Sequence, residues 1–334
     1  MYYFIVLWLL ICWKVCKKVE LSQLVIAILP VFAMIAFRSE TVGIDTLRYL
    51  DRFTSLDKND TLVDLLNTWD TEKGYVVLCY ILTQLDLGNQ SLFITESLVF
   101  CGSIVFFCHN SAKDKLFVML STVLSLSVFA LTGVRQTFAL SLFLVAYWFA
   151  QEKRWLIYII LGCLAASFHT SALLVFPFAI LINFKFNKRA ITMYAVILIF
   201  SLLSINTIFY QVSTILSYED YQLMSFQGGY ISFIVSVLFG VVVFNMIKAE
   251  QKNKTFQQAA HYTILYALFS AIRFVNIMIM RVMLYLSVFP YLMIDALDEN
   301  KKTKRYKVLA VTYCVLYFLY NLYNDGSSYE FYWQ

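Results

Sequence analysis

Long apolar runs succeed one another along almost the whole chain, and only short polar segments separate them. They dominate the composition, since 61% of the 334 residues are hydrophobic, 14% are charged and the mean hydropathy is +0.71. A soluble domain cannot bury that much apolar surface, whereas a lipid bilayer solvates it. The chain contains no Ser/Gly-rich linker and no clear repeat. We therefore predict one all-α transmembrane domain that covers residues 1–334.

The apolar runs predict where the transmembrane helices lie. A helix needs about 20 apolar residues to cross a bilayer, and fewer where the bilayer thins or flanking residues snorkel. We expect about twelve spans, several of them short by this standard, near residues 2–13, 21–37, 91–108, 116–131, 133–150, 155–168, 170–183, 190–209, 229–247, 260–276, 281–297 and 306–323. The first run precedes its basic residues, Lys14, Lys17 and Lys18, whereas a signal peptide has its charges first. We expect a retained span whose N-terminus faces outward.

The basic residues predict the orientation, because cytoplasmic loops carry an excess of lysine and arginine. If the N-terminus lies outside and the spans alternate, the inside loops are 14–20, 109–115, 151–154, 184–189, 248–254 and 298–307. These loops hold 18 of the 26 lysines and arginines, and each of them is basic. An even number of spans then places both termini outside in a multi-pass protein.

One apolar segment, residues 75–87, is too short to cross comfortably and would invert every later loop if it were a span. We predict that it forms a re-entrant or interfacial helix on the outer face. It would end a long outer segment, residues 38–90. A shorter outer loop is expected at residues 210–228.

The charge and cysteine patterns argue against a nucleic-acid-binding site and against a disulfide framework or metal site. The net charge of +5 lies mostly in the short inside loops, and no basic helix or aromatic-basic module is present, so we expect no nucleic-acid partner. None of the seven cysteines forms a Cys-x-x-Cys pair, and most lie in apolar runs. This pattern indicates inert thiols rather than disulfides or a metal site. We expect neither a metal nor a cofactor.

Arginine and lysine are distributed differently between the two faces. The inside loops hold 15 lysines and 3 arginines, whereas the outer side holds 6 arginines and 2 lysines. Four outer arginines lie at or inside the ends of apolar spans: Arg38, Arg135, Arg273 and Arg281. A charge at the centre of a span is unfavourable by about 2.5–3.5 kcal/mol, and by less near the interface. One such arginine can snorkel to headgroups or pair with a local acid, but four on one face indicate a binding site.

A lipid-linked anion fits such a cluster. Guanidinium is planar, stays charged and holds phosphate through two parallel hydrogen bonds. An undecaprenyl pyrophosphate would keep its tail in lipid while its diphosphate sits in a desolvated cationic clamp. In a glycosyl transfer this clamp would stabilise the departing pyrophosphate without a metal.

Five motifs in a fixed order carry a family resemblance. They are FRSETVGIDTLRY (37–49), EKGY (72–75), GVRQTFALSL (133–142), SFHTSALLVFPF (167–178) and RVMLYL (281–286). Together they resemble the EpsG branch of the Wzy-like bacterial polysaccharide polymerases, from about residue 30 to 290. Each motif is weak alone, and the ordered set is specific to the family but not to any one sugar. The early position of the long outer segment departs from the late outer loop of many broader relatives.

The resemblance implies a membrane-embedded glycosyltransferase of the GT-C type in the bacterial inner membrane. Such a polymerase makes O-antigen, capsule or exopolysaccharide by moving the growing chain from one undecaprenyl pyrophosphate onto the non-reducing end of another lipid-linked oligosaccharide. The implied partners are undecaprenyl-pyrophosphate-linked oligosaccharides and membrane lipids, with a chain-length regulator and a flippase as candidate protein partners. No metal is generally required.

The motifs and the arginine positions together define the predicted site. The predicted catalytic residues are Arg135, His169, Glu72 and Asp45. The predicted ligands of substrate or pyrophosphate are Arg38, Gln136, Arg273 and Arg281, of which Arg273 rests on its position alone. Alternatives stay open for each: a helix cap or headgroup contact for an arginine, a satisfied structural group for the histidine, and plain solvation for a loop carboxylate. As a base, His169 would accept a proton from the acceptor hydroxyl.

Two other functions compete with polymerisation. A lipid-linked oligosaccharide flippase needs charges along a path through the membrane and often has internal repeats, but here the intramembrane charges gather toward one face. A membrane O-acetyltransferase would tolerate a basic outer face and one histidine, yet the early arginine–histidine pattern of that class is absent. Both rank behind the polymerase.

Overall fold

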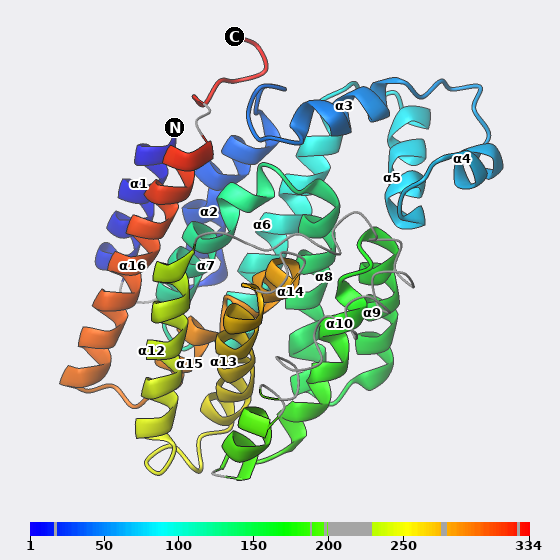
Figure 1. Ribbon diagram of the computed structural model, residues 1–334. Coiled ribbons are helices and arrows are strands. Elements are labelled where there is room, and N and C mark those ends of the chain that lie inside the picture. The colour runs from blue at the N-terminus through cyan, green and yellow to red at the C-terminus, as the bar shows by residue number, and fades with distance from the viewer. Residues whose placement is uncertain (17–18, 188, 197–198, 200–228, 275–278, 326–327) are drawn as a thin grey trace. The chain divides into compact units, whose positions relative to one another are not determined.

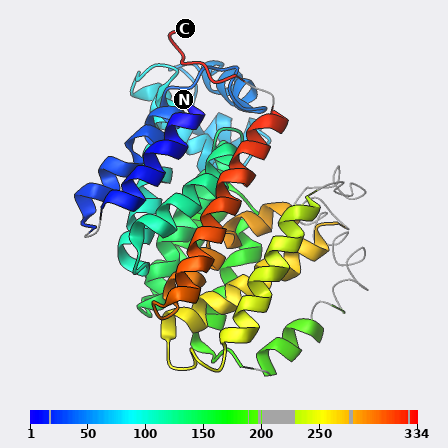
Figure 2. The ribbon, with the colours of Figure 1, turned by 90° about the vertical axis from the view of Figure 1, so that its left-hand side faces the viewer.

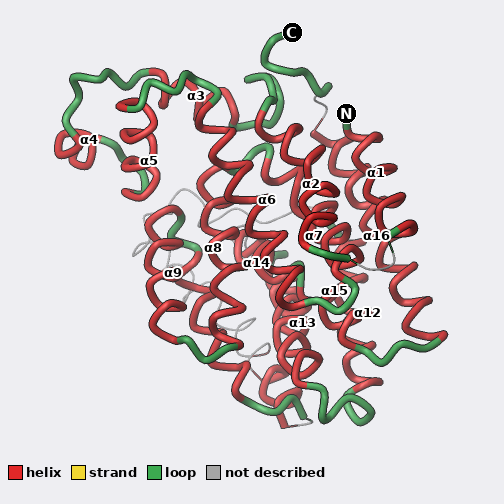
Figure 3. Tube along the Cα trace, turned by 180° about the vertical axis from the view of Figure 1, so that it is seen from behind, coloured by secondary structure: helices red, strands yellow, loops and turns green. Residues whose placement is uncertain are grey.

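A computed structural model describes the chain except for residues 17–18, 188, 197–198, 200–228, 275–278 and 326–327. In the described part the regular structure is helical, and the only β-type pairing is an isolated bridge between Arg38 and Phe331 (Figure 3). This confirms the predicted all-α class. The described chain divides into two compact units, Met1–Ala172 with Arg305–Gln334, and Leu173–Lys304. Each unit is described by itself, and the single transmembrane domain stays a prediction.

The first unit is a bundle of long apolar helices. They are α1 (Tyr2–Val15), α2 (Leu21–Ala36), α6 (Ser91–Ser111), α7 (Lys115–Ala130), α8 (Val134–Gln151), α9 (Trp155–Phe168) and most of α16 (Lys301–Asp325). The helix α6 packs against both α2 and α8, and α8 packs along α9. The buried apolar side chains of α6 recur at intervals of three and four residues, as Phe100, Ile104, Phe107 and Cys108 show. That spacing keeps one apolar stripe against the neighbouring helices.

Residues 38–90, the predicted outer segment, fold into three short helices, α3 (Thr46–Thr54), α4 (Leu62–Thr68) and α5 (Lys73–Gln84). Figure 1 shows α3 at one end of the long helices, with α4 and α5 to one side. Thr61 begins α4, because its hydroxyl accepts a hydrogen bond from the backbone N–H of Asp64 at 3.2 Å. Helix α5 has 12 residues and is therefore about 18 Å long, too short to cross a bilayer core of about 30 Å. The predicted short outer helix is present, and its re-entrant or interfacial placement stays a prediction.

A hydrophobic cluster fastens the outer segment to the bundle. It joins side chains of α3, α5, α6 and α8, namely Phe53, Tyr75, Cys79, Leu82, Leu92, Phe93, Val134 and Phe138. Partly buried Tyr49, Trp69 and Phe168 pack against its edge. Burial of each large apolar side chain contributes about 1.5–3 kcal/mol. The cluster therefore fixes residues 38–90 against α8. Two of its members on α8, Val134 and Phe138, lie close to Arg135 in the sequence.

The C-terminal segment returns to the beginning of the outer segment (Figure 2). The backbone N–H of Ser39 donates to the carbonyl of Glu330 at 2.9 Å, and that of Tyr332 donates to the carbonyl of Phe37 at 3.0 Å. The Tyr329 hydroxyl donates to the carbonyl of Met34 at 3.0 Å. The aromatic end of the chain is thus tied to the C-terminal end of α2.

The second unit centres on α13 (Lys254–Ile272), which packs against η1 (Phe176–Asn183), α12 (Tyr230–Met246), α14 (Ile279–Leu286) and α15 (Phe289–Ala296). A short helix, α10 (Ala172–Val175), lies at the junction of the two units. One buried polar network joins α13 to the segment that follows η1, since His261 contacts the hydroxyl of Tyr194 at 2.7 Å and the carbonyl of Phe184 at 3.0 Å. The predicted outer loop 210–228 lies outside the described residues.

Two helical segments of the described chain are long and apolar enough to cross a membrane, Ser91–Ser111 and Ile279–Ala296. Shorter apolar helices of 10–17 residues accompany them: Tyr2–Val15, Leu21–Ala36, Lys115–Ala130, Trp155–Phe168, Ala172–Asn183 and Tyr230–Met246. Most lie where the sequence predicts spans. The total of twelve spans and the outward placement of both termini stay predictions.

Candidate functional site

Arg135 stands at the start of α8, directly after the tight turn that follows α7. Gly133 is the N-cap residue of α8, and Val134 enters the hydrophobic cluster, so Arg135 is the second residue of the helix. Its Nη1 donates to Thr71 Oγ1 at 2.6 Å and to Glu72 Oε2. Its Nε lies 3.4 Å from Tyr49 Oη, and its guanidinium carbon lies 5.8 Å from the centre of the Tyr49 ring. Three side chains of the outer segment therefore orient one arginine of the bundle.

Glu72 joins Arg135 to His169. It is the N-cap residue of α5, yet its carboxylate forms no capping hydrogen bond with that helix. Instead Oε2 pairs with Arg135 and accepts from Thr71 Oγ1 at 3.3 Å, while Oε1 lies 2.9 Å from His169 Nδ1. The Glu72 carboxylate is therefore fixed by Arg135, Thr71 and His169 rather than by the N-terminus of its own helix.

His169 ends α9 and carries the third group of the site. It is the C-cap residue of α9, with extended backbone, and its side chain is only 4% exposed. Glu72 is 11% exposed and Arg135 is 25% exposed, so the arginine is the most exposed of the three side chains. The three predicted residues Arg135, Glu72 and His169 are thus in direct contact, although they come from three separate motifs.

The surroundings of Glu72 keep its carboxylate ionised. Burial alone raises the pKa of Glu72, but the hydrogen bond from His169 and the positive charge of Arg135 outweigh burial and lower the pKa to about 2. An ionised carboxylate only accepts hydrogen bonds, so His169 Nδ1 is the protonated nitrogen of that contact.

The outer segment reaches Arg135 through a close contact near its beginning. Gly43 has a φ of +92°, and a Cβ there would lie 2.0 Å from the carbonyl oxygen of Leu131, in the α7–α8 turn. The Thr46 hydroxyl is 2.9 Å from the same carbonyl and 2.5 Å from that of Val42. Only glycine permits this backbone approach and this φ together. The contact docks α3, and with it Tyr49, beside the turn that leads into Arg135.

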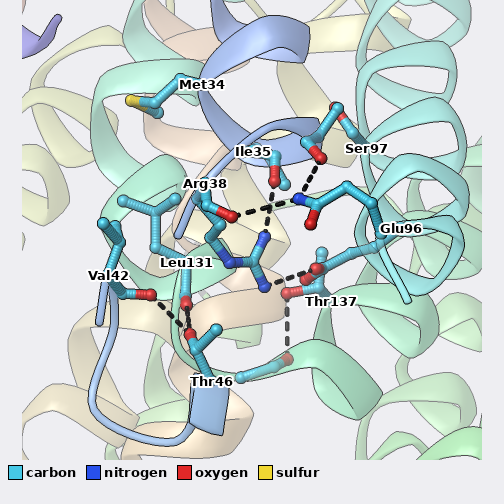
Figure 4. A network of polar contacts seen from close by, with 12 residues as sticks. Met34, Ile35, Arg38, Val42, Thr46, Glu96, Ser97, Leu131 and Thr137 are labelled. Carbon is cyan, nitrogen blue, oxygen red and sulfur yellow. Dashed lines mark hydrogen bonds and ion pairs between the residues drawn. The ribbon is translucent and has the colours of Figure 1, made fainter. Parts of the chain in front are cut away.

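Arg38 occupies a different environment, within the bundle (Figure 4). Its side chain is completely buried, and its Nη2 donates to Glu96 Oε2 at 2.8 Å, while Nη1 donates to the carbonyl of Ile35 at 2.9 Å. The guanidinium carbon lies 4.0 Å from the centre of the Phe93 ring. The structure therefore shows Arg38 paired with a local acid, which is the alternative left open by the sequence. Its role as a diphosphate ligand stays a prediction.

Four predicted site residues remain: Asp45, Gln136, Arg273 and Arg281. Asp45 is half-buried at the N-terminus of α3, where its side chain does not cap the helix. Gln136 is buried in α8. Arg273 and Arg281 belong to the second unit, where Arg273 Nη2 is 2.9 Å from Ser232 Oγ and Arg281 lies half-buried in α14. Their catalytic and ligand roles stay predictions.

Three residues of these networks were not predicted from the sequence. Tyr49 and Thr71 contact Arg135 directly, and Glu96 pairs with Arg38. Tyr49 closes the first ordered motif, and Thr71 immediately precedes the second. Glu96 is the only acidic residue within the predicted span 91–108, and an intramembrane carboxylate is itself a signal for a buried partner.

The geometry of the group suits an anion next to a base. Arg135 and Glu72 stand at the N-termini of α8 and α5, where the helix dipoles favour negative charge. Within the described part of the chain, Arg135 Nη2 has no hydrogen-bond acceptor, so one side of the guanidinium can bind a ligand oxygen while Nε and Nη1 are held. No group of three or more His, Cys, Asp or Glu side chains that could hold a metal is found among the described residues.

An all-helical apolar chain with a polar group at the helix ends defines a membrane protein with a candidate site for an anionic substrate. The model of the EpsG family matches residues 22–333, and the chain belongs to this family. The predicted family resemblance is thereby confirmed over nearly the whole chain. No curated protein and no solved structure matches the chain. Membership of the family points to a role in polysaccharide biosynthesis.

Proposed function

We propose that this protein is a polysaccharide polymerase that joins undecaprenyl-pyrophosphate-linked oligosaccharide repeat units on the outer leaflet of the inner membrane. The observation that carries the proposal is the contact of Arg135 and His169 with the two oxygens of one carboxylate, Glu72. This contact combines an anion-binding group with a proton acceptor. A glycosyl transfer with a diphosphate leaving group requires both.

In the proposed reaction, a hydroxyl at the non-reducing end of one repeat unit attacks the anomeric carbon of the growing chain. The bond between that carbon and the diphosphate oxygen breaks, and undecaprenyl pyrophosphate departs with the bonding electrons. Arg135 stabilises the negative charge that develops on the diphosphate, since Nη2 is directed to no other described group. The helix N-termini of α5 and α8 add to this stabilisation.

His169 is the proposed base that accepts the hydroxyl proton at Nε2. Glu72 fixes the ring through Nδ1 and stabilises the imidazolium that forms. The C-terminal end of α9 acts in the same direction, because a helix C-terminus favours positive charge. The proposal also includes a catalytic role for Asp45. It includes binding of substrate or pyrophosphate by Arg38, Gln136, Arg273 and Arg281. The GT-C type of fold is part of it.

The test is a chromosomal deletion complemented with wild type, Arg135→Ala or Arg48→Ala, with the surface glycan resolved by length on a gel. Arg48 is an exposed arginine of α3 and serves as a matched control. We expect wild type and Arg48→Ala to restore a ladder of long chains and Arg135→Ala to leave a single repeat unit. An unchanged ladder in the deletion would reject polymerisation. Accumulation of the unit on the cytoplasmic side would favour transport.

A further inference from the structure

The helices α5 and α9 approach each other closely at Gly74 and Ser167. A Cβ at Gly74 would lie 2.3 Å from Ser167 Oγ, 2.8 Å from its carbonyl oxygen and 2.9 Å from its carbonyl carbon. Such distances are far below van der Waals contact, so no larger residue fits there unless one helix moves. Gly74 has an ordinary helical backbone, and its φ does not require glycine. The close approach of the two helices is therefore the reason for a glycine at this position.

This contact lies beside the candidate site in both helices. Gly74 follows Glu72 by two residues, and Ser167 precedes His169 by two residues. The Glu72–His169 hydrogen bond of 2.9 Å therefore spans the same two helix ends that meet at Gly74 and Ser167. A movement of the helix ends that takes this distance beyond about 3.2 Å, or bends the hydrogen bond below about 120°, weakens it.

The other residues of the EKGY motif hold α5 in this register. Lys73 Nζ donates to the carbonyls of Leu66 and Trp69, at 2.6 and 3.2 Å, and so joins α5 to α4. Tyr75 is fully buried in the hydrophobic cluster. Contacts with α4 and with the hydrophobic cluster thus hold α5, whereas its contact with α9 at Gly74 involves no side chain of α5.

We propose that Gly74 and Ser167 act as a spacer that sets the distance between Glu72 and His169, so that Gly74 is a positioning residue of the site. The inference about catalysis rests on the proposed function, whereas the spacer itself is a statement about geometry. Adding a methyl group at Gly74 pushes α5 from α9 and breaks the Glu72–His169 contact. The Arg135–Glu72 pair uses the other carboxylate oxygen, Oε2, and is therefore a separate contact from the one that the spacer sets.

The first test reads the contact without any activity. The chain has three histidines, so the isotope-labelled, detergent-solubilised protein gives few imidazole NMR signals, and His169→Ala identifies the relevant one. We expect Gly74→Ala to change the His169 signal and its pH titration in the same sense as Glu72→Gln. Gly102→Ala is the matched control, because a Cβ at Gly102 in α6 meets nothing within 4 Å. A wild-type His169 signal in Gly74→Ala would overturn the proposal.

The second test uses polymer length in the complemented deletion. A misplacement of about 1 Å can reduce catalysis by about 100-fold, so we expect Gly74→Ala to shorten the ladder at least as much as Glu72→Gln does. The double variant Gly74→Ala/Glu72→Gln should lose no more polymer length than the more severe single variant, whereas the losses would multiply if the two changes acted independently. Ser167→Val enlarges the contact from the partly exposed α9 side and should give the same loss if Gly74→Ala accumulates poorly. A full ladder from Ser167→Val with a displaced His169 signal would overturn the catalytic part and leave the spacer intact.

If the deletion itself leaves the ladder unchanged, the proposed function fails. The NMR comparison still decides whether Gly74 sets the contact.

Discussion

His169 Nδ1 lies 2.9 Å from Glu72 Oε1, although 97 residues separate the two in the chain. The contact brings the end of α9 to the beginning of α5, and the second oxygen of Glu72 pairs with Arg135 at the beginning of α8. Three helix ends thus meet at one carboxylate. The chemistry proposed for this protein depends on whether these groups act as a unit, which the first prediction addresses.

Removal of the base and of its orienting carboxylate should have overlapping effects. We expect His169→Ala to reduce the rate of chain elongation by about 10²–10⁴-fold, the usual contribution of a general base. Glu72→Gln should reduce it by less than that, because the amide still positions the ring without stabilising its charge. The pair His169→Ala/Glu72→Gln should be close to His169→Ala alone, measured with purified protein and lipid-linked units. A multiplicative loss would show that the two act independently.

Arg135 should not tolerate replacement by lysine. Lysine keeps the charge, but it lacks the planar fork that allows Arg135 to contact Tyr49 and Thr71 while binding a diphosphate. We expect Arg135→Lys to lower the elongation rate by about 10²–10³-fold, the range for loss of one charge-stabilising donor. The exposed Arg48, changed to lysine, should leave the rate at the wild-type level. Equal rates for Arg135→Lys and wild type would mean that only charge is needed at this position.

The stability of the site should depend on acid pH through Glu72. Its folded pKa of about 2 lies below the ordinary value of 4.5, so its contribution is fully present above about pH 4.5 and is lost as the pH falls toward 2. That contribution is on the order of 3 kcal/mol. We expect the melting temperature of solubilised Glu72→Gln to lie below that of wild type at pH 7. The gap should shrink between pH 4.5 and 2, and a constant gap would contradict an ionised, paired Glu72.

The sequence predicts the long helices well because each apolar run has a polar boundary. Arg135, Glu72 and His169 could be named from the sequence as candidate residues, since each is a polar side chain at an end of an apolar segment, and their role in a site stays a prediction. Their mutual contact was not predictable, because it depends on how α3, α4 and α5 fold back over α8 and α9. That fold depends on backbone contacts at Gly43 and Gly74, which no hydropathy pattern reveals.

Arg38 shows the limit of reasoning from position. Like Arg135, it lies at the end of an apolar run, and the sequence predicts both as members of one anion-binding cluster. The difference is Glu96 on α6, 58 residues away, whose carboxylate lies 2.8 Å from the Arg38 guanidinium. Pairing of two buried side chains from distant segments depends on the register of α2 against α6, which the sequence pattern leaves open.

The last prediction separates the structural role of Arg38 from its predicted role in substrate binding. Both side chains of the Arg38–Glu96 pair are completely buried. Removing one partner strands the other charge, so Arg38→Met or Glu96→Leu alone should destabilise the protein by about 3–5 kcal/mol. The double variant Arg38→Met/Glu96→Leu removes both charges and should recover most of the melting temperature, because apolar replacement of a buried pair is often neutral.

The glycan ladder of this double variant then shows whether Arg38 has a role in substrate binding besides its ion pair with Glu96. If a stable double variant restores the ladder, Arg38 acts only through its partner, and the anion site of the first unit rests on Arg135. If the double variant is as stable as wild type but leaves only single repeat units, Arg38 has a role beyond the ion pair. The diphosphate would then have to reach Arg38 through a rearrangement of the C-terminal segment, whose bridge to Arg38 lies at Phe331. Deletion of residues 329–334 would test that route, since it removes the bridge and leaves the Arg38–Glu96 pair in place.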